Sequence, residues 1–452
     1  MRTRSLNTRR SRHLLIAPAA AALAAALVVG CGPAHATAGS PAPTAGGRPA
    51  PASAVQVSHD HFGAHAEPSV AVNPRNPRNL LAAARVFQGK ARDLATYASF
   101  DGGVTWQSNG ILPGSALGED ANVTVTFDQA GHGYVGGLVT SSTAGGGGPE
   151  YIWRTDDGGR HFRPPVVAMR GNTDHSGLAA DPAAGATDLY LAGIAFHGSA
   201  GEVYFCRSTD SGRSFEPARS IDPAHSPYDR LTVVAAGPDG TVAVKYYVEP
   251  PGGGVPGAVA TTTDHGTSYA VPVRLGTVRS PLPAPGVSTR SGPAIAIDPR
   301  TGDIYASVTT YAPATGASEV EVFTSRDHGR SWSAPAVVAS NVHGTYFQPQ
   351  LAVGDGGRVG LSVFELARGR VQVVMVTSTP AGASFGAPRT VTGSSFDPTL
   401  GLASGDGAAA QHWLGNYQGL AAAPGAFHPL WNDTRTGHLE LFTTAFPVAP
   451  QP

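Results

Sequence analysis

The sequence is poor in cysteine and in charged residues. Its 452 residues include two cysteines, Cys31 and Cys206, which are too few for a disulfide framework. Cys206 ends the strand-like run Val203–Cys206, where we expect it to be buried as an apolar residue. The formal net charge is −1, and no basic run occurs after the N-terminal region. The composition therefore gives no support to a nucleic-acid partner.

Several motifs that carry chemistry are also missing. The 16 histidines form no His-x-x-x-His or Glu-x-x-His cluster of the kind that binds zinc. No serine nucleophile elbow accompanies an ordered set of Ser, His and Asp. The run Gly145–Gly148 lacks a phosphate-binding pattern and is interpreted as a flexible loop. We expect neither a zinc site nor a cofactor.

The N-terminal region is typical of an export signal. Five arginines in the first twelve residues precede an apolar run from Leu14 to Gly30. This run is short for an uncleaved membrane span. Two cleavage patterns compete: Leu27–Cys31 resembles a bacterial lipobox that would leave a lipidated Cys31, and Ala34–Ala36 is an ordinary signal-peptidase pattern. We favour the lipobox, which predicts a protein that is secreted or held by a lipid on the outer face of the cell membrane.

The next segment is too simple in composition to form a core. Residues 32–52 are almost entirely Gly, Pro, Ala, Ser and Thr, which is typical of a flexible linker. We therefore predict an export signal over 1–30, a tether over 31–53, a folded domain over 54–446 and a short tail over 447–452.

A short motif, Ser/Thr-x-Asp-x-Gly-x-x-aromatic, recurs through the folded part. The Asp can accept hydrogen bonds from the backbone of a turn, the Gly permits a positive φ, and the aromatic anchors the turn in a core. A sixth copy keeps the frame but has Pro380 in place of the Asp. The copies begin at Ser99, Thr155, Ser208, Thr262, Ser325 and Ser378. Five intact copies indicate a repeat architecture.

The period of the repeat predicts the size of each unit. The third positions of the motif fall at 101, 157, 210, 264, 327 and 380, so one unit has about 53 to 63 residues, which suits a four-stranded propeller blade. Short apolar runs upstream of the motifs begin near residues 68, 121, 177, 231, 293 and 349, and a seventh begins near 418. The last unit lacks a fourth strand, and an exposed edge is unfavourable. We predict an all-β, seven-bladed propeller in which Ala54–Ser58 supplies that strand.

These turns resemble the Asp-boxes, or bacterial neuraminidase repeats, of the sialidase-like β-propellers. The resemblance covers about residues 54 to 446. It implies one propeller domain in which each box lies between the third and fourth strands of a blade, on the face opposite the usual ligand face. It does not imply a single activity, because this fold carries several functions.

The sialidases of this family have six blades, and a six-bladed form is the alternative for this chain. They bind the substrate carboxylate with three arginines and use an Asp as acid/base and a Tyr, assisted by a Glu, as nucleophile. The first arginine lies in an Arg-Ile-Pro motif that opens the first blade. The matching residues here are Ala66, Glu67 and Pro68, so that arginine is absent. The methyl side chain of Ala66 cannot make the bidentate contact of a guanidinium group.

Residues just before the innermost strand of each blade line the mouth of the central channel in propellers, where ligands bind. Alignment of the first strands places seven residues there, and six of them are polar or ionisable. The starts of inner strands are, however, often polar without binding a ligand. The aligned residues are Glu67, Asp120, His175, Asp229, Gly292, Gln348 and Tyr417.

This alignment assigns candidate roles. A carboxyl group crowded by other acids has a raised pKa, so we expect Asp120 or Asp229 as the acid/base, and the resemblance implies Tyr417 as the nucleophile. Arg85, Arg230 and Arg290 could form an anion clamp. The expected substrate-binding residues are Glu67, Arg85, His175, Arg230, Arg290 and Gln348. A Ca²⁺ on Glu67, Asp120 and Asp229 is an alternative, but their spacing resembles no dedicated calcium loop.

Two functions stay open. The first is an exo-α-sialidase-like glycoside hydrolase, or a lectin-like relative of one, that recognises extracellular glycans through the axial pocket. The second is a non-catalytic propeller that scaffolds cell-envelope proteins. Both predict a monomer that contacts the membrane only through a lipid on Cys31.

Overall fold

A computed structural model describes residues 53–448 except 90, 116–118, 141–146, 223–228, 250–254, 279–285 and 404–410. The chain divides into the units Met1–Gly47 and Arg48–Pro452, and all described residues belong to the second. The predicted export signal, the lipobox at Cys31 and nearly all of the predicted tether lie outside the described residues.

The described residues form an all-β structure. Short 3-10 turns are the only helical elements in this part of the chain: η1 (Asp355–Gly357), η2 (Pro380–Gly382) and η3 (Pro398–Leu400). No helix among the described residues has the length and apolar character needed to cross a membrane. The prediction of an all-β fold is therefore confirmed.

The strands pair mainly with their neighbours in the sequence, in antiparallel order. The first half of the chain contains β1 (Val55–Gln56), β2 (Ala64–Val72), β3 (Leu80–Gln88), β4 (Ala91–Ser99), β5 (Gln107–Ile111), β6 (Glu119–Phe127), β7 (Gly133–Thr140), β8 (Gly148–Thr155), β9 (Val166–Ala180), β10 (Leu189–His197), β11 (Ala200–Ser208) and β12 (Arg219–Ser220). Next come β13 (Asp229–Ala236), β14 (Val242–Val248), β15 (Val255–Thr262), β16 (Val273–Val278), β17 (Ala294–Ile297), β18 (Ile304–Ala312), β19 (Ala317–Ser325) and β20 (Ala336–Asn341). The last part contains β21 (Gly344–Gly354), β22 (Arg358–Ala367), β23 (Arg370–Thr377), β24 (Arg389–Thr390), β25 (Leu402–Ala403), β26 (His412–Trp413), β27 (Gly419–Ala423), β28 (Ala426–Asp433), β29 (Glu440–Thr443) and β30 (Phe446–Pro447).

One long strand joins two successive groups of four. The first part of β9 pairs with β8, and its last part pairs with β10. Gly171, at φ 107, lies where the pairing of β9 with β8 is irregular, between Met169 and Thr173, in a conformation that glycine adopts without strain. A single parallel pair, Arg92 with Glu119, also joins β4 to β6, so β2 to β12 form one eleven-stranded sheet.

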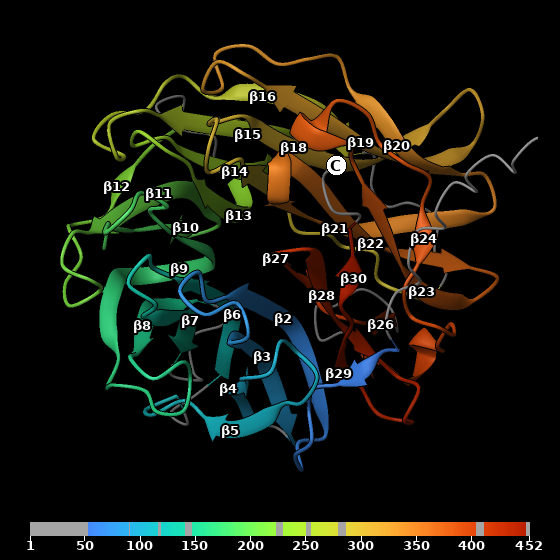
Figure 1. Cartoon of the computed structure of the whole chain (residues 1–452), viewed down its shortest axis with the longest axis horizontal. Helices are drawn as coiled ribbons and strands as arrows, with labels where there is room; N and C mark the ends of the chain where they lie inside the picture. The colour runs from blue at the N-terminus through green and yellow to red at the C-terminus, as the bar shows by residue number, and fades with distance from the viewer. Residues whose placement is uncertain are drawn as a thin grey trace, which may run out of the picture. The chain divides into compact units, whose positions relative to one another are not determined.

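The first strands of the groups contact one another in sequence. Contacts run from β2 to β6, β9, β13, β17, β21 and β27, and β27 contacts β2 again. The groups accordingly follow one another around a common centre (Figure 1). The last group is completed from the N-terminal side, because Val55 and Gln56 pair with Thr443 and Phe442. The expected pairing of Ala54–Ser58 with the last unit is thus observed for these two residues.

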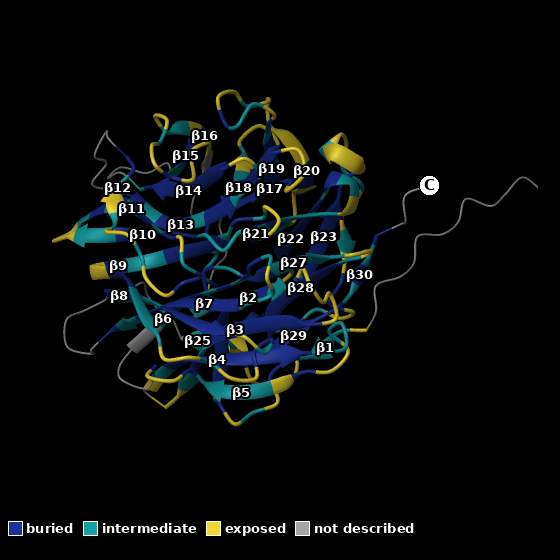
Figure 2. Cartoon of the chain, turned by 60° about the vertical axis from the view of Figure 1, so that its left-hand side comes forward, coloured by how far each residue is buried: buried dark blue, intermediate teal, exposed yellow. Residues whose placement is uncertain are grey.

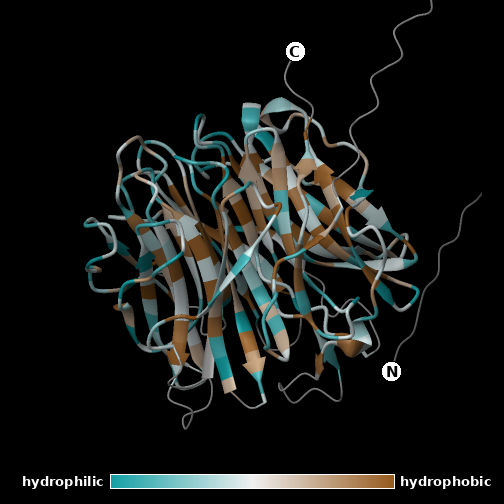
Figure 3. Ribbon diagram, turned by 60° about the horizontal axis from the view of Figure 1, so that its bottom comes forward, coloured by the Kyte–Doolittle hydropathy of each residue, from teal (hydrophilic) through white to brown (hydrophobic). Residues whose placement is uncertain are grey.

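The core lies between the sheets, so most strands are buried on both faces. The strands are mainly buried and the connecting turns exposed (Figure 2), and apolar residues run along most strands (Figure 3). In β14, Val244 and Tyr246 pack toward the preceding sheet, whereas Ala243 and Tyr247 pack toward the following one. Lys245 is the polar exception within this strand: it is fully buried, and its Nζ donates to Ser307 O at 2.8 Å.

The motif turns have the geometry that their residues predict. In the first, Asp101 Oδ1 accepts from the amides of Val104 and Thr105 at 3.0 and 2.9 Å. Ser99 Oγ accepts from the amide of Gly103 at 2.9 Å. The intact copies at Asp157, Asp210, Asp264 and Asp327 also accept backbone amides.

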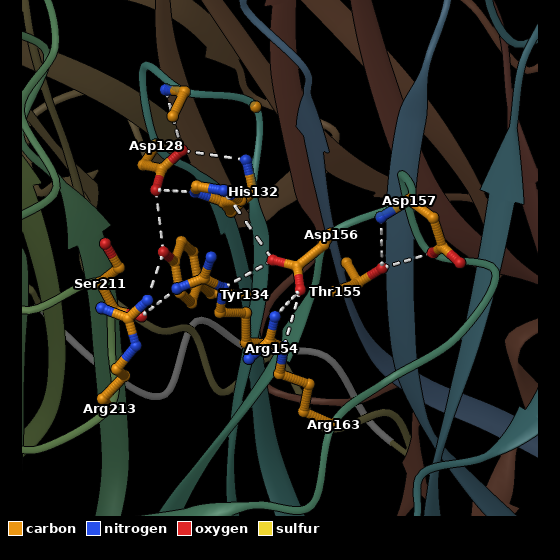
Figure 4. Close-up of polar contacts among 12 residues, drawn as sticks. Asp128, His132, Tyr134, Arg154, Thr155, Asp156, Asp157, Arg163, Ser211 and Arg213 are labelled. Carbon is orange, nitrogen blue, oxygen red and sulfur yellow. Dashed lines mark hydrogen bonds and ion pairs between the residues drawn. The ribbon is translucent and has the colours of Figure 1, made fainter.

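These turns also join neighbouring groups of strands. Arg154 Nη1 donates to Ser211 O at 3.0 Å, beside a network in which Tyr134 OH donates to Asp128 Oδ2 at 2.8 Å (Figure 4). In the next pair of groups, Arg207 Nη1 of β11 donates to His265 O in the turn after β15 at 3.2 Å. His265 also contacts the preceding sheet through its side chain, because its Nδ1 lies 2.9 Å from Tyr190 OH.

Candidate functional site

Five first strands carry a β-bulge at the same relative place, and each bulge holds a non-glycine residue with a positive φ. The bulges interrupt the pairing of β2, β6, β9, β13 and β21 with their neighbours. This conformation is strained for residues other than glycine, and bulges redirect side chains. We name these residues the bulge ring: Glu67 (54°), Asn122 (58°), His175 (51°), Leu231 (53°) and Gln348 (54°).

The bulge ring corrects the alignment made from the sequence. Glu67, His175 and Gln348 occupy the expected equivalent position, but Asn122 and Leu231 take the places assigned to Asp120 and Asp229. Asp120 pairs with Val139 in β6, and its side chain lies outside the described residues. Asp229 starts β13 and is fully buried. The apolar runs were aligned two residues early in these two units, because a bulge adds residues that the pattern does not reveal.

A short segment, Gly415–Gln418, ties the first strands together; we name it the axial segment. Tyr417, the expected nucleophile, lies in it, and its hydroxyl donates to a backbone carbonyl. Burial raises the pKa of Tyr417 well above its usual range, and the nearby Glu67 carboxylate adds to the effect. The hydrogen bonds of the segment are Asn416 Nδ2 to Glu67 Oε1 (3.0 Å), Tyr417 OH to Val123 O (3.1 Å), Gln418 Nε2 to Gln348 O (3.0 Å) and Gly292 N to Asn416 O (2.6 Å).

A cavity of about 110 Å³ lies among the first strands next to the axial segment. Its lining comes from all seven first strands or the residues beside them, so it is an axial cavity. The lining includes Asn122, Thr124, His175, Gly177, Leu231, Val233, Gly292, Gln350 and Tyr417. A volume of this size suits a few water molecules or one small group.

Glu67 is the one acidic residue of the bulge ring. Its side chain is buried, and burial raises its pKa, opposed by the nearby Arg85 and His175. Arg85 Nη1 lies 3.9 Å from Glu67 Oε2. Neither Glu67 Oε2 nor Arg85 Nε has a hydrogen-bond partner among the described residues. A buried carboxylate oxygen and a guanidinium nitrogen therefore both retain the capacity to bind a ligand.

A second buried acid, Glu150, was missed by the sequence reasoning. Burial, with a smaller contribution from the nearby Asp174, raises its pKa to about 8 against the lowering effect of the Ser176 hydrogen bond. Glu150 Oε2 accepts from Ser176 Oγ at 2.8 Å, next to His175. Asp174 in turn accepts from Asn122 Nδ2. Glu150 lies on β8, the third strand of its group, whereas the sequence reasoning considered only the first and second strands.

The other expected binding residues have local partners away from Glu67. Arg230 Nη1 donates to Asp229 O at 2.6 Å, and Arg230 Nη2 donates to Ser199 O at 3.3 Å. Arg290 Nη2 lies 3.9 Å from Glu249 Oε1. Contacts among the described residues therefore do not assemble Arg85, Arg230 and Arg290 into one clamp.

Gln348 is held in the site by backbone carbonyls and keeps one side-chain atom without a partner. Gln348 is fully buried, and its Nε2 donates to the carbonyls of Arg290 and Gly415. Its Oε1 has no hydrogen-bond partner among the described residues. Within the described part of the chain, no group of three or more His, Cys, Asp or Glu is arranged to hold a metal ion.

Comparison with known proteins gives structural matches alone. No protein-family model matches the sequence, and no curated protein matches it. A polysaccharide lyase of family PL25, an ulvan lyase, is similar in structure with a TM-score of 0.52 and 12% identity, covering 85% of this chain and 95% of that chain. An α-L-arabinofuranosidase from Fusarium graminearum, in complex with an iminosugar inhibitor, has a TM-score of 0.50 and 12% identity, covering 88% and 98%. At this identity the matches show the fold alone.

Proposed function

We propose that this protein recognises glycans outside the cell through a site formed by the bulge ring and the axial segment. The architecture in this proposal is a seven-bladed propeller. The circuit of contacts that returns from β27 to β2 supports it, as does the pairing of β1 with β29. The arginine-rich, apolar N-terminus supports export, with a lipid on Cys31 as the preferred anchor.

The observation that carries the proposal is the Glu67–Arg85 pair at the bulge ring. Both side chains are largely buried at 2% and 15% exposure, and each retains an unused polar atom. Carbohydrates present hydroxyl groups that both donate and accept hydrogen bonds, so a carboxylate and a guanidinium side by side suit them. The similar structures include enzymes named for action on polysaccharides or arabinofuranosides, which supports a glycan ligand.

Glycan hydrolysis is the more demanding form of the proposal. Hydrolysis requires a group that stays protonated at neutral pH to act as the acid. Glu150 meets this requirement, because burial raises its pKa to about 8. Asp120 and Asp229, the acids expected from the sequence, lie two residues before the bulge-ring residues Asn122 and Leu231. The Tyr417 hydroxyl donates a hydrogen bond to Val123 O, and in this proposal Tyr417 positions the site.

The test is binding and turnover on a panel of sialosides and plant and bacterial polysaccharides. Glu67→Gln keeps the size of the side chain but removes its charge. We expect it to weaken binding of the best glycan by ~tenfold or more through loss of a charged hydrogen bond. Glu216→Gln, on the opposite face at a motif turn, is the matched control and should bind as the unmodified protein does.

A second candidate is a scaffold for envelope proteins, favoured by the absence of the first sialidase arginine at Ala66. Copurification of one envelope protein, together with no binding to any glycan on the panel, would support it. Mass analysis of the mature N-terminus tests the anchor: a lipidated Cys31 supports it, and a free Thr37 contradicts it.

A further inference from the structure

A second, open groove lies beside the bulge ring, lined by residues that take no part in the site proposed for glycans. Its volume is about 500 Å³. Three turns border it, between β18 and β19, β20 and β21, and β22 and β23, at the same strand ends as the bulges. We name it the lateral groove; its lining includes Tyr311, His343, Thr345 and Arg368.

Strand β21 connects the lateral groove to the bulge ring. Thr345 lines the groove, and Gln348 belongs to the ring three residues later on the same strand. At about 3.3 Å per residue, the two positions are ~10 Å apart along the strand. An extended ligand at the ring could therefore also occupy the groove.

The ionisable side chains that line the lateral groove are all basic. Its lining contains Arg368 and His343 but no carboxylate. The side chains of Arg368 and His343 have no hydrogen-bond or ion-pair partner among the described residues, in contrast to Arg290, which faces Glu249. The ring of Tyr311, which is 36% exposed, offers a flat apolar surface beside these groups.

Arg368 is held in a conformation that does not favour it. It forms a two-residue turn with Gly369, in which the φ angles are 51° and 73°. Hairpin turns with two positive φ angles favour Asn or Gly at the first position. The presence of Arg at a strained position on the rim of a groove points to a role for its side chain.

We propose that the lateral groove binds the anionic group, a carboxylate or a sulfate, of an acidic polysaccharide whose neighbouring residue occupies the bulge ring. The guanidinium of Arg368 binds the anion in a bidentate manner, His343 adds a hydrogen bond, and Tyr311 supports the sugar ring. This inference rests on the proposed function and specifies its substrate class.

The test compares three probes in calorimetric titrations at low and high salt: polygalacturonate, dextran sulfate and neutral dextran. Two variants are used: Arg368→Ala, and Arg368→Asn, which places a favoured residue in the turn. Arg330→Ala is the matched control, because the Arg330 side chain also lacks a partner among the described residues and lies at a motif turn.

We expect both Arg368 variants to bind at least one acidic polysaccharide ~tenfold or more weakly, with reduced salt dependence, while Arg330→Ala binds as the unmodified protein does. The two acidic probes distinguish carboxylate from sulfate. Unchanged binding by Arg368→Asn overturns the inference. A protein that binds only neutral glycans, and loses them on Glu67→Gln, overturns the inference while the proposed function stands. Failure to bind any glycan overturns both.

Discussion

At the scale of single residues, two buried ionisable groups have strongly shifted pKa values and opposite charge types. Burial raises the pKa of Glu150 to about 8 and lowers the pKa of Lys245 to about 7. Each shift makes the stability of the fold depend on pH, because the folded and unfolded chains bind different numbers of protons. The two dependences have opposite signs.

Glu150→Gln tests the first of these groups. Between about pH 4.5 and 8 the unfolded chain loses the Glu150 proton and the folded chain keeps it, so the stability contributed by this group falls as pH rises. The variant lacks this loss and should gain a few kcal/mol over the unmodified protein at pH 8, but little at pH 4. Urea unfolding at both pH values measures the difference. An equal difference at the two pH values would contradict the raised pKa.

Lys245→Met tests the second group. Between about pH 7 and 10 the unfolded chain keeps the Lys245 proton while the folded chain has lost it, so stability rises with pH over this range. The variant, which retains the apolar stem of the side chain, should show a flatter profile from pH 7 to 10 and a higher melting temperature at pH 6. A variant less stable than the unmodified protein at pH 6 would show that the hydrogen bond to Ser307 outweighs the cost of burial.

At the scale of elements, the motif turns were predictable from the sequence, and the bulges were not. A turn needs Asp, Gly and Ser or Thr at fixed spacing, so its residues reveal it. A bulge depends on pairing with the neighbouring strand, and Glu67, Asn122 and Leu231 share no residue type. Glu150 escaped notice because it lies on a third strand, and nothing in the sequence pattern shows that it is buried or that it accepts a hydrogen bond from Ser176 of the next strand, β9.

Asp210→Ala tests the role of a motif turn. Asp210 Oδ1 accepts the amides of Arg213 and Ser214, each at 2.9 Å. Loss of these bonds should cost about 1–2 kcal/mol, as for other lost capping groups, with glycan binding unchanged. Chemical denaturation and the glycan titrations provide the two readouts. Loss of binding at unchanged stability would mean that the ligand face has been assigned to the wrong side.

At the scale of the whole described unit, the first and last groups of strands are held together by contacts distant in sequence. Beyond the pairing of β1 with β29, Val57 N donates to Leu441 O at 2.8 Å. His65 lies between two acids, 3.1 Å from Asp60 and 3.2 Å from Glu440. The repeat period predicted that the last group would have an unpaired edge, and hence that the N-terminal segment would pair with it. It did not predict that His65 would be buried there.

Deletion of residues 53–59 tests this closure. We expect the whole unit to become less stable in a single transition, because every group depends on its neighbours around the circuit of first strands. Deletion of residues 32–50 is the control and should leave the melting temperature unchanged. Calorimetry measures the melting temperature of both variants. Equal melting temperatures would contradict a structural role for β1.

The most direct test of the central claim is a crystal structure of the protein with an oligosaccharide from its best glycan. We expect electron density for a sugar residue in contact with Glu67 and Arg85, next to the axial segment. Density at the motif turns on the opposite face, with the bulge ring empty, would contradict it.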